Sequence, residues 1–329
     1  MRRREFITGL AGAAAGWPLT ARAQQPERTR RIGLLMGGVE SDAFGQTAIA
    51  LFRQRLQELG WTEGRNVIID YRWGAGDPDR YRRTAAELIA LAPDVIVTTS
   101  GGSVNALRQV GAAVPIVFAG AGDPAARGLV ESLARPGSNI TGFFSDQYSV
   151  NGKMLELLKE IAPRVTRAAA LYDRTGAAQG RNLPAIQDAA EALRVELLTI
   201  NASSAGAIER GVAAFASAPN GGLLAPLGVA VNIHRELIIK LAARYRLPAV
   251  YTTRQFVADG GLISYGPVIT DILRGAASYV DRILKGEKPA NLPVQGPTKY
   301  EMVLNLKTAK ALGIDVPPTV FVRVDEVIE

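Results

Sequence analysis

Residues 95–119 read VIVTTSGGSVNALRQVGAAVPIVFA, and this stretch decides the fold class. The aliphatic run at 95–98 predicts a short buried strand, the apolar spacing over 103–110 predicts a helix, and a second aliphatic run at 115–119 predicts another strand. Two successive strands joined through a helix usually pair in parallel. The stretch therefore predicts a β-α-β unit of a parallel sheet.

The same alternation of aliphatic runs and helical patterns extends in both directions along the chain. In the first half we expect further strands at 32–36, 66–71 and 139–144, and helices at 44–59 and 79–91. In the second half we expect strands at 168–172, 195–200, 222–225, 249–251, 262–265 and 300–306, with helices at 152–161, 179–193, 205–217, 230–245, 268–284 and 308–312. Strands this uniformly aliphatic are typical of sheets covered by helices on both faces. The chain is thus expected to be α/β, with two successive α/β units.

Length and composition agree with two globular cores. The chain has 329 residues, more than a single hydrophobic core usually contains. Its 47% hydrophobic and 21% charged residues are ordinary for a globular protein. The net charge of +7 could suggest a nucleic-acid partner, but lysine and arginine are interspersed with aspartate and glutamate and form no basic arm. We therefore expect no nucleic-acid partner.

The residue types present exclude several kinds of chemistry. The chain contains no cysteine, which excludes disulfides, thiolate metal sites, a cysteine nucleophile and a lipid-modified cysteine. His234 is the single histidine, so a serine protease triad or a multi-histidine metal site would have to depend on it. A polar residue near a helix start is the alternative interpretation of His234. We expect no cofactor, no metal and no enzymatic activity.

The amino terminus has the features of an export signal. Arg3 and Arg4 precede an Ala/Gly-rich apolar run at 9–16, and residues 21–23 form a small-x-small cleavage pattern. Paired arginines before a weakly apolar run resemble a twin-arginine signal. We therefore predict a signal peptide over residues 1–23, cleavage after Ala23 and a periplasmic location without a lipid anchor. A short basic amphipathic helix is the alternative.

Nucleotide-binding and hydrolase motifs are incomplete or missing. The glycines after the first, third and fourth predicted strands complete neither G-x-G-x-x-G nor a P-loop. The stretch 101–105 fails the last position of the nucleophile elbow G-x-S-x-G. An enzyme built on this fold is therefore the least favoured hypothesis.

Small polar residues follow the third predicted strand, where a helix is expected to begin. Residues 98–103 read TTSGGS and offer hydroxyls and unpaired backbone N–H groups to a carboxylate or another anion. An ordinary capped turn is the alternative. Asp123 follows the fourth predicted strand, where it could bind a ligand ammonium or cap its own turn. Phe44, Tyr71 and Trp73 could each form an aromatic wall of a cleft or pack in the core.

Several longer motifs stand in the order found in one known family. They are the stretches 59–67 (LGWTEGRNV), 115–118 (PIVF), 123–124 (DP), 128–142 (GLVESLARPGSNITG), 260–266 (GGLISYG), 279–286 (YVDRILKG) and 305–313 (NLKTAKALG). Together they resemble the ABC transporter substrate-binding family, whose better-understood branch takes up tryptophan and other aromatic amino acids. The resemblance covers essentially the whole chain after the signal peptide.

The resemblance implies a type I periplasmic-binding-protein fold, with two Rossmann-like lobes that hold a ligand between their parallel sheets. Three interlobe crossovers would fall near 143–149, 264–267 and 293–298. The first α/β lobe would comprise residues 29–143 and 267–292, and the second residues 144–266 and 293–329. By this mapping, the helix at 268–284 returns to the first lobe and the last strand and helix to the second.

The resemblance also implies which loops contact the ligand and which partners the protein has. The implied ligand-binding residues are Gly38, Ser100, Gly101, Gly102, Ser103, Asp123, Ser145, Asp173, Gly228 and Thr253. The ligand would be a small organic molecule, with an aromatic amino acid or an aromatic or small carboxylate favoured. A monomer would close around it and deliver it to an ABC permease with its ATPase. A periplasmic sensor subunit for a signalling membrane protein is the alternative function.

Overall fold

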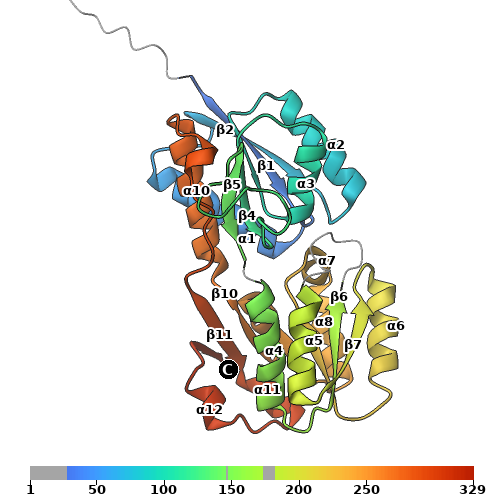
Figure 1. The fold of residues 1–329 in the computed structure, drawn as a ribbon. Coiled ribbons are helices and arrows are strands. Elements are labelled where there is room, and N and C mark those ends of the chain that lie inside the picture. Colours follow the sequence, from blue (N-terminus) through green and yellow to red (C-terminus); the bar gives the residue numbers. More distant parts are fainter. Residues whose placement is uncertain (1–27, 146, 173–181) are drawn as a thin grey trace, which may run out of the picture.

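A parallel sheet with helices on both faces forms the first lobe of the computed structural model, which describes residues 28–145, 147–172 and 182–329. Five described strands lie in the order β2-β1-β3-β4-β5 (Figure 1). Their bounds are β1 (Arg30–Met36), β2 (Val67–Trp73), β3 (Val95–Thr98), β4 (Ile116–Ala121) and β5 (Ile140–Phe144). This sheet contains the β-α-β unit expected from residues 95–119.

Helices cover both faces of the first sheet, and their side chains form two cores. On one face lie α1 (Ala43–Glu58) and α10 (Ile269–Leu284), and on the other α2 (Pro78–Ala90) and α3 (Gly101–Gln109). Asp42, Asp77 and Ser100 are the N-caps of α1, α2 and α3, and each side chain accepts a hydrogen bond from the first turn of its helix. These caps fix where each helix starts at the carboxyl end of the preceding strand.

The second lobe has a mixed sheet of seven described strands in the order β12-β11-β10-β9-β8-β6-β7. All neighbours are parallel except β10 and β11. The strands are β6 (Arg167–Tyr172), β7 (Glu196–Asn201), β8 (Gly221–Ala225), β9 (Ala249–Tyr251), β10 (Ile263–Pro267), β11 (Tyr300–Asn305) and β12 (Glu326–Ile328). The α/β class expected from the sequence is confirmed.

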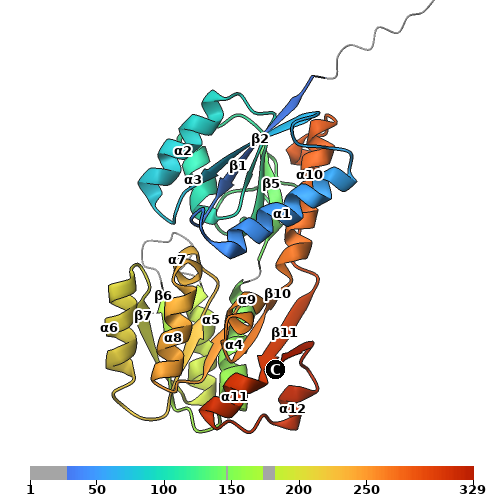
Figure 2. The ribbon, with the colours of Figure 1, turned by 180° about the vertical axis from the view of Figure 1, so that it is seen from behind.

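Helices also cover the second sheet. The larger ones are α4 (Gln147–Ile161), α5 (Asn182–Leu193), α6 (Ala205–Phe215) and α8 (Arg235–Arg244), and the shorter ones are α7 (Val229–Ile233), α9 (Arg254–Ala258), α11 (Leu306–Leu312) and α12 (Pro318–Phe321). Helix α4 packs beside α5, and α6 packs beside α8 (Figure 2). In the described part of the chain, no helix combines the length and apolar character needed to cross a bilayer.

Among the described elements, three connections join one lobe to the other. It leaves β5 for α4, then runs from β10 through Val268 to α10, which packs against α1, β4 and β5. After α10, the short 3-10 helix η2 (Pro289–Asn291) contacts β5, and the chain returns to the second lobe as β11. Gln295 still donates its N–H to Gly142 O of β5 at 3.0 Å. The last passage therefore lies just after residue 295.

One predicted helix is divided in the structure. The apolar spacing predicts a single helix over 230–245, but α7 ends and α8 begins at His234, whose backbone leaves the helical region with ψ 19°. The short elements α9, α12 and β12 were not expected, because three to five residues are too few to show a period. The break at His234 matters for the site, because it aims α7 at the first lobe.

Candidate functional site

A cavity of about 330 Å³ lies between the two lobes. Its walls in the first lobe come from residues at the carboxyl ends of β1, β2, β3 and β4 and from α1, α2, α3 and α10, and its wall in the second lobe comes from α7 and the residues just before it. The carboxyl ends of parallel strands are where open α/β sheets bind ligands. The cavity is therefore the candidate binding site.

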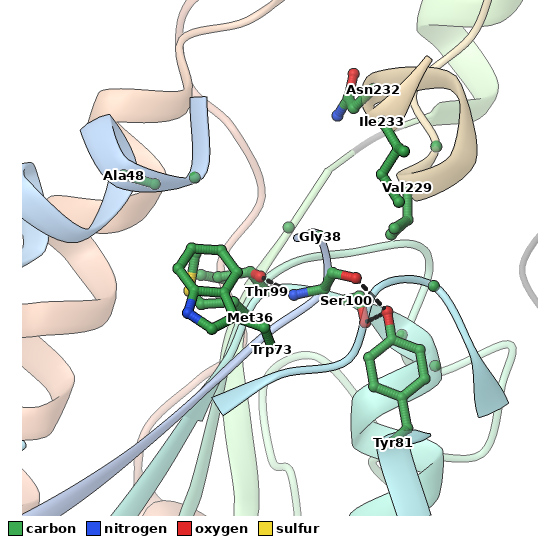
Figure 3. Close-up of a pocket in the computed structure, with 18 of the residues that line it drawn as sticks. Met36, Gly38, Ala48, Trp73, Tyr81, Thr99, Ser100, Val229, Asn232 and Ile233 are labelled. Atoms are coloured by element: carbon green, nitrogen blue, oxygen red, sulfur yellow. Dashed lines mark hydrogen bonds between the residues drawn. The ribbon is translucent and has the colours of Figure 1, made fainter. Parts of the chain in front are cut away.

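The polar end of the cavity is built on the turn between β3 and α3. Ser100 Oγ accepts a hydrogen bond from Ser103 N at 3.1 Å, and the Tyr81 hydroxyl donates to Gly37 O at 2.8 Å. Thr99 Oγ1 accepts from Gly37 N at 2.9 Å. Figure 3 shows Ser100 beside Tyr81 on this side of the cavity, where the Ser100 hydroxyl donates to the Tyr81 hydroxyl at 3.2 Å. These bonds hold the first turn of α3 against the end of β1.

The start of α3 presents positive electrostatic potential to the cavity. Gly101 and Gly102 line the wall, and their N–H groups belong to the first turn, where no intrahelical acceptor exists. The guanidinium of Arg127, from the connection after β4, donates to Gly101 O at 3.2 Å. Asn105 and Gln109 extend the same face of α3 along the wall. This arrangement suits a carboxylate or another anion.

The opposite end of the cavity is apolar. It is lined by Met36, Phe44, Ala48, Trp73, Ile269, Ile272 and Leu273. Trp73 is 7% exposed and belongs to the core between the sheet and α1, yet one side of it faces the cavity. A Cβ built on Gly45 would lie 2.8 Å from Cζ3 of Trp73, so only glycine lets the indole lie this close to α1. Trp73 therefore packs in the core and also forms part of the cavity wall, so both alternatives left open by the sequence apply.

The other two candidate aromatics differ from each other. Phe44 lines the cavity from α1. Tyr71 packs against the core cluster, and its hydroxyl donates to the Glu63 carboxylate at 3.2 Å. Tyr71 is therefore a structural residue of the first lobe.

The second lobe closes the cavity through α7. Gly228, Val229, Asn232 and Ile233 line this wall, and Figure 3 shows the last three of them. A Cβ built on Gly37 would lie 3.2 Å from Cγ2 of Val229, so the two lobes are in contact at this point. The structure therefore shows the closed arrangement of the lobes.

Half of the residues proposed from the resemblance line this cavity. They are Gly38, Ser100, Gly101, Gly102 and Gly228. Asp173 lies outside the described residues. Ser103, Asp123, Ser145 and Thr253 follow the expected strands but are not part of the cavity wall.

The side chains of Ser103, Asp123 and Ser145 form hydrogen bonds within the first lobe instead, and Thr253 is buried at the start of α9 without a side-chain capping bond. Ser103 is fully buried and bonds to Thr98 and Ser100. Asp123 accepts from Ala126 N at 3.0 Å, as a cap would, and Ser145 Oγ donates to Gly120 O at 3.3 Å. Thr253 is 5% exposed and is the N-cap residue of α9. A strand's end places a loop near the cleft but does not decide which side chains reach it.

Several lining residues were missed by the sequence analysis. They are Tyr81, Asn105, Gln109 and Asn232. Asn105 and Gln109 follow the Ser100 turn at helical spacing, and this signal could have found them. Asn232 could not be found, because its position depends on the break at His234. His234 itself does not line the cavity, and burial lowers the pKa of its imidazole below the ordinary value. The described residues hold no cluster of three or more His, Asp or Glu placed for a metal ion.

Replacing Tyr81 with phenylalanine should lower the free energy of unfolding by ~1 kcal/mol, because the buried Gly37 carbonyl loses its donor while the ring still packs. Urea denaturation would measure the change. Tyr148→Phe is the matched control, since the Tyr148 ring is 55% exposed and its hydroxyl bonds to the exposed Asp188. Equal losses in both variants would contradict a structural role for the Tyr81 hydroxyl.

Comparison with known proteins shows which protein family this chain matches. The family model described as "ABC transporter substrate binding protein" matches residues 37–328. A tyrosine-binding protein of Clostridioides difficile (strain R20291) is 23% identical over 263 residues, covering 80% of this chain and 75% of the relative.

Two solved structures share the fold. An ABC domain from Streptococcus pneumoniae in complex with L-Trp has a TM-score of 0.81 at 23% identity, covering 91% of this chain and 100% of the other. A ligand-free, open substrate binding protein from Clostridium difficile has a TM-score of 0.64 at 21% identity, covering 91% and 99%. The fold expected from the resemblance, a type I periplasmic binding protein, is confirmed. The chain belongs to the ABC transporter substrate binding protein family.

Proposed function

We propose that this protein is the periplasmic solute-binding component of an ABC importer and that it captures an aromatic amino acid or a related aromatic carboxylate. The single observation that carries the ligand class is the two-ended cavity. An apolar end beside Trp73 faces a polar end at the start of α3. An aromatic carboxylate has matching ends, and the cavity volume of about 330 Å³ falls in the range of small-molecule sites.

The proposed contacts follow from this orientation. The ligand carboxylate binds at Ser100, Gly101 and Gly102, with Asn105 beside it, and the ring lies against Trp73. Two relatives support the ligand class, because one is named for tyrosine and another was solved with L-Trp. Closure of the lobes buries the ligand and involves no bond chemistry, so we propose no enzymatic activity.

The partners and location follow from the family and the amino terminus. The closed surface of a monomer would be presented to an ABC permease with its ATPase. The paired arginines and the cleavage pattern at 21–23 support export by the twin-arginine route.

Adding L-tryptophan or L-tyrosine should raise the melting temperature of residues 24–329, because a ligand that binds only the folded protein stabilises it by about 2.7 kcal/mol at one hundred times its dissociation constant. A thermal-shift assay followed by calorimetry would measure this. Tryptamine, which has the indole but no carboxylate, is the matched control and should give a much smaller shift. Shifts with sugars and none with any aromatic acid would contradict the proposal.

A further inference from the structure

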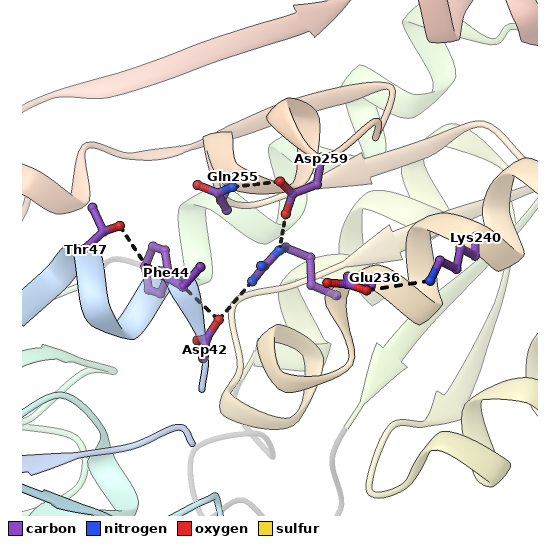
Figure 4. Close-up of polar contacts among 9 residues, drawn as sticks. Asp42, Phe44, Thr47, Glu236, Lys240, Gln255 and Asp259 are labelled. Carbon is purple, nitrogen blue, oxygen red and sulfur yellow. Dashed lines mark hydrogen bonds and ion pairs between the residues drawn. The ribbon is translucent and has the colours of Figure 1, made fainter. Parts of the chain in front are cut away.

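A buried ion pair joins the two lobes beside the cavity. Arg235, the first residue of α8 in the second lobe, donates from Nη1 to Asp42 Oδ1 of the first lobe at 3.3 Å (Figure 4). Both side chains are only 10% exposed. Solvent screening is therefore weak at this contact.

Each partner of the pair is held firmly within its own lobe. Arg235 Nε donates to Asp259 Oδ2 at 2.6 Å, and Gln255 donates to the other Asp259 oxygen at 2.8 Å. Asp42 is the N-cap of α1 and accepts from Phe44 N at 3.2 Å. Burial by itself lowers the pKa of Arg235. The carboxylates of Asp259 and Asp42 outweigh this effect and hold the pKa above its ordinary value, so the guanidinium is charged. The pair thus joins two preorganised groups.

The position of the pair couples it to the cavity. Arg235 follows α7, whose residues Val229, Asn232 and Ile233 form the second-lobe wall. Asp42 precedes α1 and also lines the cavity, whereas Arg235 does not. Moving α7 away from the first lobe would separate Arg235 from Asp42. The contact therefore belongs to the closed arrangement alone, while the bond to Asp259 survives opening.

We propose that Arg235 is a positioning residue that sets ligand affinity without touching the ligand, by holding α7 closed through Asp42. The apparent dissociation constant of a protein with a closed, binding-competent state is the intrinsic value divided by the closed fraction. In the open state, Asp259 still pairs with Arg235, so opening leaves no buried charge unpaired.

The closed fraction can be measured without any ligand. The natural chain contains no cysteine, so Ala86→Cys and Ala213→Cys would carry the only two spin labels. These exposed positions lie on α2 and α6, which stand on the same side of the molecule in opposite lobes (Figures 1 and 2). Pulsed electron-spin distance measurements then give the closed-to-open ratio.

Asp42→Asn and Arg235→Gln, singly and together, form the test. Asparagine keeps the N-cap of α1 while it removes the charge. We expect each single variant to lower the closed-to-open ratio by about tenfold, and the double variant to be no worse than either, because both remove the same contact. The dissociation constant for L-tryptophan should rise by the same factor.

Arg254→Gln is the matched control, because Arg254 pairs with Glu326 within the second lobe. It should leave both the closed-to-open ratio and the affinity unchanged. Unchanged distances in the Asp42 and Arg235 variants would overturn the inference, as would a ligand-free wild type with no detectable closed population. Weaker binding in Asp42→Asn alone would also overturn it, since Asp42 would then act on the ligand directly.

The affinity measurement rests on the proposed function, whereas the distance measurement does not. If L-tryptophan fails to bind but the variants shift the lobes toward the open state, the ligand assignment fails and the role of Arg235 stands. If L-tryptophan binds equally well to every variant and the distances do not change, the role of Arg235 fails and the ligand assignment stands.

Discussion

Replacing Trp73 with alanine is expected to raise the dissociation constant for L-tryptophan by about 30-fold or more. Trp73 forms the wall at the apolar end of the cavity, where buried aromatic side chains dominate binding energies. Removing the indole leaves a space that the ligand ring cannot fill. The ligand ring also loses its stacking contact with the indole. Because Trp73 also belongs to the core, the free energy of unfolding should fall by ~3 kcal/mol. Calorimetric titration and urea denaturation would measure the two effects.

A second tryptophan separates binding from stability. Trp61 packs against the same core cluster and donates to Asp281 Oδ1 at 2.8 Å, but it does not line the cavity. Trp61→Ala should therefore lower stability and leave the affinity unchanged, while Trp73→Phe should keep most of the binding. If Trp61→Ala and Trp73→Ala weaken binding equally, Trp73 acts only through the core.

Replacing Gly142 with alanine should lower the free energy of unfolding by at least ~3 kcal/mol, since a backbone clash adds to an unfavourable dihedral angle. Gly142 pairs with Phe118 in the neighbouring strand and has φ 148°. An added Cβ would lie 2.1 Å from Phe118 O, and this contact cannot relax by a side-chain rotation. The melting temperature should fall by roughly 10 °C. Thermal and urea denaturation would measure the loss.

Gly128 provides the matched control for this prediction. It lies in the same 128–142 motif and also has positive φ, but a Cβ at this position would meet open space. Gly128→Ala should cost only about 1 kcal/mol, the penalty of the left-handed conformation. Similar losses in both variants would show that the dihedral angle, rather than the contact with Phe118, makes Gly142 necessary.

The central β-α-β unit was predictable because its signals are local. The aliphatic run at 95–98 coincides with β3, and the expected strand at 115–119 overlaps β4. The expected helix at 103–110 overlaps α3, which begins two residues earlier at Gly101, and the polar stretch 98–103 located the polar end of the cavity. The break between α7 and α8 was not predictable, because the apolar spacing continues through His234 while its backbone leaves the helix.

For the site, local signals located loops but not side chains. Asp123 and Ser145 follow strands as expected, yet Asp123 caps its own turn and Ser145 bonds back to Gly120 O of β4, and neither lines the cavity. The sequence alone therefore determined the α/β class, the family and the loops around the site, because strand periods, caps and motifs are properties of neighbouring residues. Only the tertiary structure decided that Trp73 has one side in the cavity and that Arg235 meets Asp42. That last contact joins residues 193 positions apart, and no local pattern encodes a distance set by the packing of two lobes.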